Sequence, residues 1–95
     1  MSKESLTERQ KLLLMLLAEE ACEVGQAASK CYRNGFDHVR KSAPGVSTAE
    51  TLMEEIADVL VIVDSLVKED VGIVMSEILK LKAKKTVERA ARNGS

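Results

Sequence analysis

Two short runs of this chain contain apolar residues only, and they restrict its folding more than any other feature. Residues 12–18 and 59–63 hold no polar side chain, and the length and flanks of both runs favour helix. A helix that is apolar on every side has to be covered on every side. A chain of 95 residues suits one small domain, which buries only a modest part of its surface. We therefore expect a single all-α helical domain over residues 1–95, with three long helices and a core completed by dimerisation.

The first long helix has start and stop signals. Ser5 with Glu8, and Thr7 with Gln10, have the spacing of a capping box. The chain then continues without proline to residues 33–35, whose Arg-Asn-Gly sequence is typical of a helix that ends in the left-handed conformation.

Residues 36–46 break the helical pattern. Residues 42–45, with the sequence Ser-Ala-Pro-Gly, form a turn or loop, and we expect a short helical turn over residues 36–39. The aromatic rings of Tyr32 and Phe36 could stack on a base, but anchoring the loop in the core is the simpler role for them.

The second and third helices follow this loop. Ser47 and Glu50 again have capping-box spacing, so the second helix should begin there. We expect the third helix over about residues 71–91, with cationic last turns that suit the helix dipole. Residues 1–5 and 92–95 are expected to fray.

Composition restricts the partners and the compartment. A net charge of −1 provides no field that favours nucleic acid polymers or membranes, and 2% aromatic residues leave little surface for base stacking. The apolar runs are too short to span a bilayer, and residues 1–5 do not resemble the start of a signal peptide. On one helix Cys22 and Cys31 would lie roughly 13 Å apart, too far for a disulfide, so we expect free thiols in the cytoplasm.

Acidic residues interrupt the two apolar helices at a repeated spacing. They are Glu19, Glu20 and Glu23 in the first helix, and Glu54, Glu55, Asp58 and Asp64 in the second. Residues three apart share a helix face, so Glu20 lies beside Glu23 and Glu55 lies beside Asp58. Because each pair shares its face with core-type residues, we expect these acids to face the bundle.

No basic residue neighbours these acids in the sequence. The first helix has no Lys or Arg between Lys11 and Lys30, and only Lys41 lies between Arg40 and Lys68. Crowded, partly buried carboxylates must protonate, pair or bind a cation. Any single glutamate is most simply a solvated surface residue, but the repeated set favours a hard divalent cation, Mg²⁺ or Mn²⁺.

Two other metal sites fit the sequence poorly. A di-iron carboxylate bundle needs Glu-x-x-His motifs, and the one histidine, His38, does not lie three residues after a glutamate. Cys22, Cys31 and His38 lack the usual spacing of zinc ligands.

The acidic pattern resembles that of a known enzyme family. Residues 19–23 (EEACE), followed further along by residues 55–58 (EIAD), are similar to the E-E-x-x-E … E-x-x-D signature of the all-α nucleoside triphosphate pyrophosphatases. That superfamily includes MazG, the dimeric dUTPases and phosphoribosyl-ATP pyrophosphatase. Over residues 12–66 the chain especially resembles short, single-domain MazG-like proteins, several of them phage-encoded.

The resemblance implies a reaction and a set of ligands. Glu20, Glu23, Glu55 and Asp58 would bind magnesium, for which manganese can substitute, and Glu19 would be an accessory ligand or orient the attacking water. The enzyme would split a nucleoside triphosphate into a monophosphate and pyrophosphate. Independently of the resemblance, the apolar helices favour a homodimer or a dimer of dimers.

Several assignments stay open at this stage. Glu54 could replace Glu55 if the ligand slipped by one position, and Asp64 has no role in the signature. Lys82, Lys85 and Arg89 share a helix face by spacing, and they either form a solvated helix end or reach the triphosphate of the substrate.

Two other functions compete with nucleotide hydrolysis. Phosphoribosyl-ATP pyrophosphatases resemble a K-x-G-E-E opening and an A-D-L-L-Y-H continuation, whereas here Leu-Ala precedes the acids and Val-Leu-Val-Ile follows Asp58. A non-catalytic helical adaptor that keeps the fold is the alternative from a different class.

Overall fold

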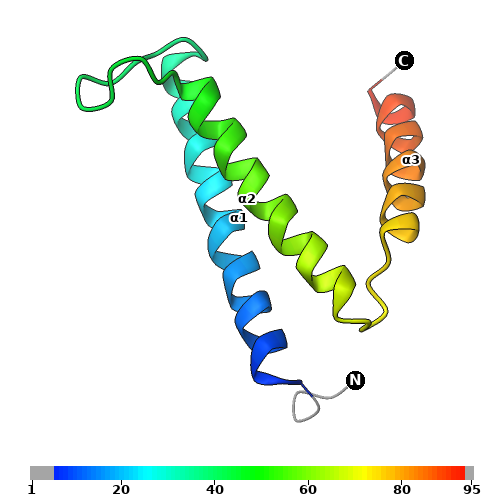
Figure 1. Cartoon of the computed structure of the whole chain (residues 1–95). Coiled ribbons are helices and arrows are strands. Elements are labelled where there is room, and N and C mark those ends of the chain that lie inside the picture. Colours follow the sequence, from blue (N-terminus) through cyan, green and yellow to red (C-terminus); the bar gives the residue numbers. More distant parts are fainter. Residues whose placement is uncertain (1–5, 94–95) are drawn as a thin grey trace. The chain divides into compact units, whose positions relative to one another are not determined.

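The computed structural model describes residues 6–93, and these form three α-helices (Figure 1). They are α1 (Glu8–Asn34), α2 (Thr48–Lys68) and α3 (Met75–Arg92). No strand occurs among the described residues, so the predicted all-α class is confirmed. The chain divides into two compact units, Met1–Ser65 and Leu66–Ser95. Within the first unit α1 and α2 lie side by side and antiparallel.

The predicted start and end of α1 are both found. Thr7 Oγ1 accepts the Gln10 N–H at 3.0 Å, and Gln10 Oε1 accepts the Thr7 N–H at 3.1 Å, which completes the capping box. The other expected capping residue, Ser5, lies outside the described residues. At the far end Gly35 has a φ of 83° and donates its N–H to the Cys31 carbonyl at 2.8 Å.

The connection between α1 and α2 differs from the expectation. Residues 36–37 form a turn, and Val39 makes an isolated antiparallel bridge with Ser47, so the predicted short helical turn over residues 36–39 is wrong. The physical reason is non-local. The His38 and Phe36 carbonyls accept the first N–H groups of α2 instead of continuing a helix of their own. Phe36 is 63% exposed, so it does not anchor the loop in a core.

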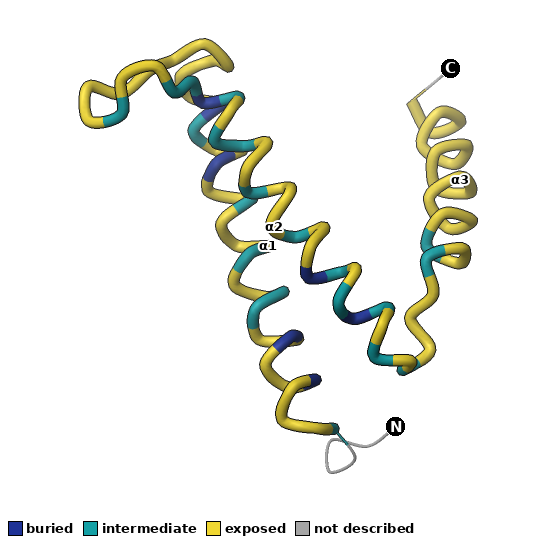
Figure 2. The backbone as a smooth tube through the Cα atoms, in the orientation of Figure 1, coloured by how far each residue is buried: buried dark blue, intermediate teal, exposed yellow. Residues whose placement is uncertain are grey.

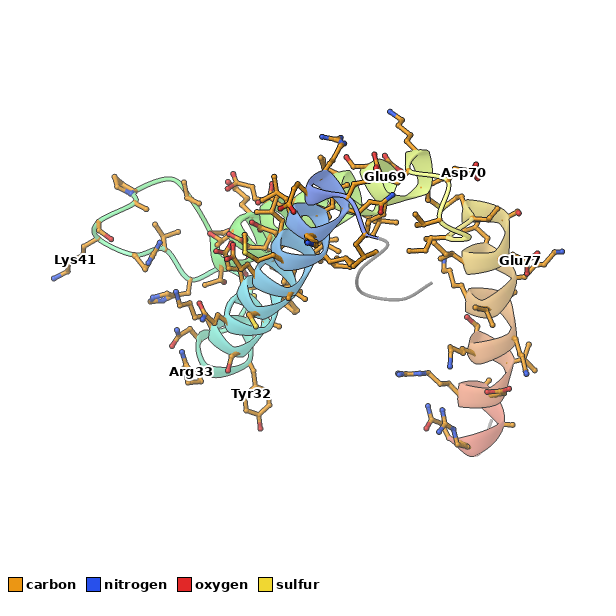
Figure 3. All side chains as sticks on the ribbon, turned by 90° about the horizontal axis from the view of Figure 1, so that it is seen from below. Tyr32, Arg33, Lys41, Glu69, Asp70 and Glu77 are labelled. Atoms are coloured by element: carbon orange, nitrogen blue, oxygen red, sulfur yellow. The ribbon has the colours of Figure 1, made fainter. Side chains whose placement is uncertain are left out.

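Tyr32 also lies outside any core. Its side chain is 91% exposed and projects away from the ribbon of α1 (Figure 3). The expectation that this ring anchors the loop is therefore wrong.

Few residues of the first two helices are buried (Figure 2). The buried apolar residues of the first unit are Leu13, Ala27, Cys31 and Ile62. The apolar runs that the sequence marked for burial remain largely accessible. Met15 is 53% exposed and Val61 is 64% exposed. Covering them would need something beyond this pair of helices.

The starts of the other two helices differ in how well they follow the sequence. Ser47 Oγ accepts the Glu50 N–H at 3.1 Å, as its capping-box position predicts. The third helix begins at Met75, four residues later than expected, because Gly72, inside the expected range, has a φ of 86° that no right-handed helix can contain. α3 buries none of its residues.

Of the residues expected to fray at the chain ends, the structure describes only residues 92 and 93. Residues 1–5, 94 and 95 lie outside the described residues. Arg92 is the last helical residue of α3, and Asn93 still donates its N–H to the Arg89 carbonyl at 3.0 Å.

Gly35 provides a test of this hairpin. Its φ of 83° and ψ of 172° lie in a region that only glycine occupies readily, so Gly35→Ala should lower the free energy of unfolding by about 1–3 kcal/mol. The matched control is Gly25→Ala. A Cβ at Gly25 meets nothing within 4 Å, and this mid-helix change should stabilise by about 0.5–1 kcal/mol. Urea denaturation followed by circular dichroism measures both, and equal effects in the two variants would contradict the assignment.

Candidate metal site

Three carboxylates from two helices meet on the facing sides of α1 and α2. Glu20 and Glu23 are three residues apart on α1 and so share a face, and Glu55 comes from α2. One oxygen from each of the three lies within 4.8 Å of the others. We call Glu20, Glu23 and Glu55 the carboxylate cluster. Such a spacing would allow one cation to contact all three side chains.

The cluster contains oxygen atoms that lack a hydrogen-bond donor. Glu20 and Glu55 are half-buried, whereas Glu23 is exposed. Oε2 of Glu20 and Oε2 of Glu55 are buried and accept no hydrogen bond from the described part of the chain. A buried acceptor without a partner opposes folding, because the hydrogen bonds that it made with water are not replaced. A cation at this point would satisfy both oxygens.

The three acids also repel one another. Partial burial, followed by the negative charge of Glu23, raises the pKa of the Glu20 carboxyl. For Glu55 a carboxyl–carboxyl hydrogen bond with Glu23 is the main cause of a raised pKa, followed by burial and the charge of Glu23. Both shifts mean that ionising the cluster is less favourable than ionising isolated carboxyls, and a nearby positive charge would relieve this.

No basic side chain within the described residues supplies that charge through an ion pair. The ion pairs join Lys11 to Glu8, Lys80 to Glu77 and Lys84 to Glu88, and each links neighbours on one exposed helix surface. The donor set is thus all oxygen and anionic, which suits magnesium or manganese and does not suit zinc or copper.

The remaining acids of the sequence pattern take different positions. Asp58 is exposed and lies outside the cluster, although its charge contributes to the raised pKa values of Glu20 and Glu55. Glu19 is exposed and is not a member. Glu55 rather than Glu54 joins the cluster, and Glu54 acts on it only through its charge. Asp64 is exposed on α2.

The predicted substrate-binding cations lie in the second unit. Lys82, Lys85 and Arg89 are exposed on α3 and line one shallow hollow together with Ile78 and Leu81. Their common face is confirmed. Their assignment to the substrate stays a prediction.

Sequence reasoning missed a set of basic residues at the other end of the α1–α2 pair. Lys30 and Arg33 belong to the last turns of α1, and His38 and Arg40 belong to the following loop, yet all four line one cavity. The signal in the sequence was that Lys30, Arg33, His38 and Arg40 occur within eleven residues around the helix stop, with Asp37 the one acid among them. It gave no indication of a shared cavity, because the loop's path depends on contacts with α2.

Comparison with known proteins adds no relative to these observations. No family model, no curated protein and no solved structure matches the chain. The likeness to MazG-like enzymes therefore rests on the acidic pattern of the sequence. Among the described residues, no helix has the length and apolar character that crossing a membrane requires.

Removing one carboxyl charge should stabilise the metal-free protein at neutral pH. The pKa of Glu20 is raised in the folded state above its ordinary value of 4.5, so the folded chain binds a proton more tightly than the unfolded chain. Stability from this group is then present below pH 4.5 and is lost as pH rises through the folded pKa. Glu20→Gln removes that loss.

Thermal unfolding in chelator tests this expectation. Glu20→Gln should melt above the wild type at neutral pH, and the gap should shrink toward pH 4.5. Glu19→Gln, an exposed neighbour, serves as the control and should melt like the wild type at both pH values. A gap that is equal at both pH values would show that the effect does not come from the charge.

Proposed function

We propose that this chain is a magnesium-dependent nucleoside triphosphate pyrophosphohydrolase, which cleaves a (deoxy)nucleoside triphosphate to the monophosphate and pyrophosphate. The observation that carries the proposal is the carboxylate cluster with its two buried, unpartnered oxygens. An anionic cluster without a basic partner fits a hard cation, and the same acids match the E-E-x-x-E … E-x-x-D signature of the all-α pyrophosphatases.

The roles of the residues follow from their positions. Glu20, Glu23 and Glu55 would hold magnesium, and Asp58, one turn beyond Glu55 on α2, would complete the set as the signature implies. Manganese can substitute, because it accepts the same oxygen ligands. Bound magnesium would neutralise phosphate charge and lower the pKa of a coordinated water.

The reaction itself is a hydrolysis at the α-phosphorus. A water oxygen bonds to this phosphorus, the α–β anhydride bond breaks, and pyrophosphate leaves while the water proton passes to solvent. Glu19 is exposed and precedes Glu23 by four residues on α1, and its carboxylate would accept a hydrogen bond from the attacking water and orient it. The chain thereby contributes positioning and electrostatics rather than a covalent intermediate.

Self-association belongs to the same proposal. Leu12, Met15, Leu60 and Val61 are each between 48% and 64% exposed, although they lie in the most apolar parts of α1 and α2. A second pair of helices against these runs would form a homodimer or a dimer of dimers. Cys22 and Cys31 are both free thiols, which suits the reducing cytoplasm.

Turnover of nucleotides is the direct test of the activity. The protein should release pyrophosphate from at least one member of a panel of NTPs and dNTPs when magnesium is present. Glu20→Gln and Glu55→Gln should each lower kcat by about 100-fold or more, the scale on which the loss of one transition-state contact acts. Glu8→Gln, an exposed acid of the first turn of α1, should leave kcat unchanged.

Thermal stability provides an independent readout of the cation. Magnesium at about 100 times its dissociation constant should stabilise the wild type by roughly 2.7 kcal/mol. The two cluster variants should lose most of that stabilisation. A folded protein that turns over no nucleotide, with cluster variants that respond to magnesium like the wild type, would point to a helical adaptor instead.

The dimer can be tested by light scattering after size exclusion. The wild type should elute with at least twice the mass of one chain. Val61→Glu should raise the dimer dissociation constant by at least about tenfold, because an unpaired carboxylate would be buried at a cost above ~1.4 kcal/mol. Val87→Glu, at an exposed apolar residue of α3, is the matched control and should not change the mass. A monomeric wild type would refute this part of the proposal.

A further inference from the structure

A cavity in the first unit lies outside the carboxylate cluster. It has a volume of about 160 Å³, is partly open to solvent, and is lined by the last turns of α1, the loop and the first turns of α2. The space equals several water molecules at roughly 30 Å³ each, which is enough for a tetrahedral phosphate group. Its polar lining includes Lys30, Arg33, His38, Arg40, Ser47 and Thr51.

The charge of this lining is one-sided. Lys30, Arg33 and Arg40 are cations, and no carboxylate lines the cavity. None of the three makes an ion pair with any residue in the range that the structure describes. Arg33 Nη1 donates to the Ser29 hydroxyl at 3.5 Å, which leaves its charge uncompensated. Such an arrangement favours an anionic ligand.

The backbone around the cavity is already satisfied. The first N–H groups of α2 are bonded within the protein, with Thr48 donating to the His38 carbonyl at 2.9 Å and Ala49 to the Phe36 carbonyl at 3.0 Å. Glu50 and Thr51 donate to Ser47. The helix start thus adds the positive end of its dipole but no free amide, so the basic side chains must make the contacts with an anion.

The cavity continues along the same helix faces as the carboxylate cluster. Lys30 follows Glu23 by seven residues on α1, a spacing that keeps the same face, and Thr51 precedes Glu55 by four on α2. At about 1.5 Å per residue, seven residues correspond to roughly 10 Å along the axis. The cavity and the carboxylate cluster both belong to the first unit. This unit therefore carries an acidic region and then a basic region along one pair of helices.

We propose that this basic cavity binds phosphate groups and holds the terminal phosphates of the nucleotide whose α-phosphate lies at the carboxylate cluster. The placement of the nucleotide's terminal phosphates in this cavity rests on the proposed function. A nucleoside triphosphate carries more negative charge than one divalent cation neutralises, so it needs a second source of positive charge. Lys30, Arg33 and Arg40 provide that source further along the same pair of helices and their connection, with Lys30 the nearest of them to the cluster in the sequence.

Binding of inorganic pyrophosphate in chelator tests the site without any metal. Calorimetry should show binding to the wild type, and the double variant Lys30→Gln/Arg40→Gln should weaken it by at least about tenfold, a loss of ~1.4 kcal/mol. Lys41→Gln is the matched control, because Lys41 neighbours Arg40 but does not line the cavity and points outward from the loop (Figure 3). It should bind like the wild type.

His38 reports occupancy directly. It is the single histidine of the sequence and lines the cavity, so its ring proton signals should move when pyrophosphate is added and stay in place in the double variant. Circular dichroism verifies that the double variant keeps its helices. A wild type that binds no pyrophosphate, or a folded double variant that binds it as well as the wild type, would overturn the proposal.

Kinetics with magnesium distinguish the phosphate site from the proposed nucleotide hydrolysis. The double variant should raise KM for the nucleotide by about tenfold or more with a smaller change in kcat, whereas Glu20→Gln lowers kcat. Pyrophosphate should compete with the nucleotide. Non-competitive inhibition would overturn the placement of the substrate's phosphates here and assign the cavity to a separate phosphate. Loss of pyrophosphate binding in the double variant, without turnover in any protein, would uphold the phosphate site and refute the proposed activity.

Discussion

Repulsion among three carboxylates is the main physical constraint on the first unit. Glu20, Glu23 and Glu55 approach one another from two helices that bury few apolar side chains between them. The raised pKa values of Glu20 and Glu55 express the cost of keeping them ionised together. Stability alone does not account for such a cluster, because crowded carboxylates without a basic partner repel one another. Its position on the facing sides of the helices is the observation on which the proposed cation site rests.

The second constraint is the separation of charge along the α1–α2 pair. Acids occupy the middle of the two helices, and basic residues gather around the cavity at the connected end. A ligand that combines a hard cation with a polyanion would complement both regions at once. The proposed substrate has this character, and the two regions would also fix the direction in which its phosphates lie.

The apolar surface of these helices sets a third condition. Side chains such as Leu60 and Val61 are more than half exposed in the isolated chain, although they continue the stretch that carries Glu55 and Asp58. Association through this surface would place apolar groups around the helix segments next to the carboxylate cluster. It would thereby lower the local dielectric and strengthen every charge interaction of the cluster.

The sequence determined those features that depend on near neighbours. Thr7 with Gln10 and Ser47 with Glu50 act over three residues, so their hydrogen bonds could be predicted, as could the helical class and the shared face of Glu20 and Glu23. The delayed start of α3 could not, because glycine accepts both signs of φ, and only the structure shows that Gly72 takes the positive φ that a right-handed helix excludes.

Only the tertiary structure decided which distant groups meet. It selected Glu55 over Glu54 and left Asp58 outside the cluster, because the rotation of α2 against α1 sets which side of each helix faces the other. It replaced the expected helical turn by a loop whose carbonyls cap α2, and so brought Lys30 and Arg40 to one cavity. Neighbouring residues fix a helix, but contacts between segments far apart in the chain fix a site.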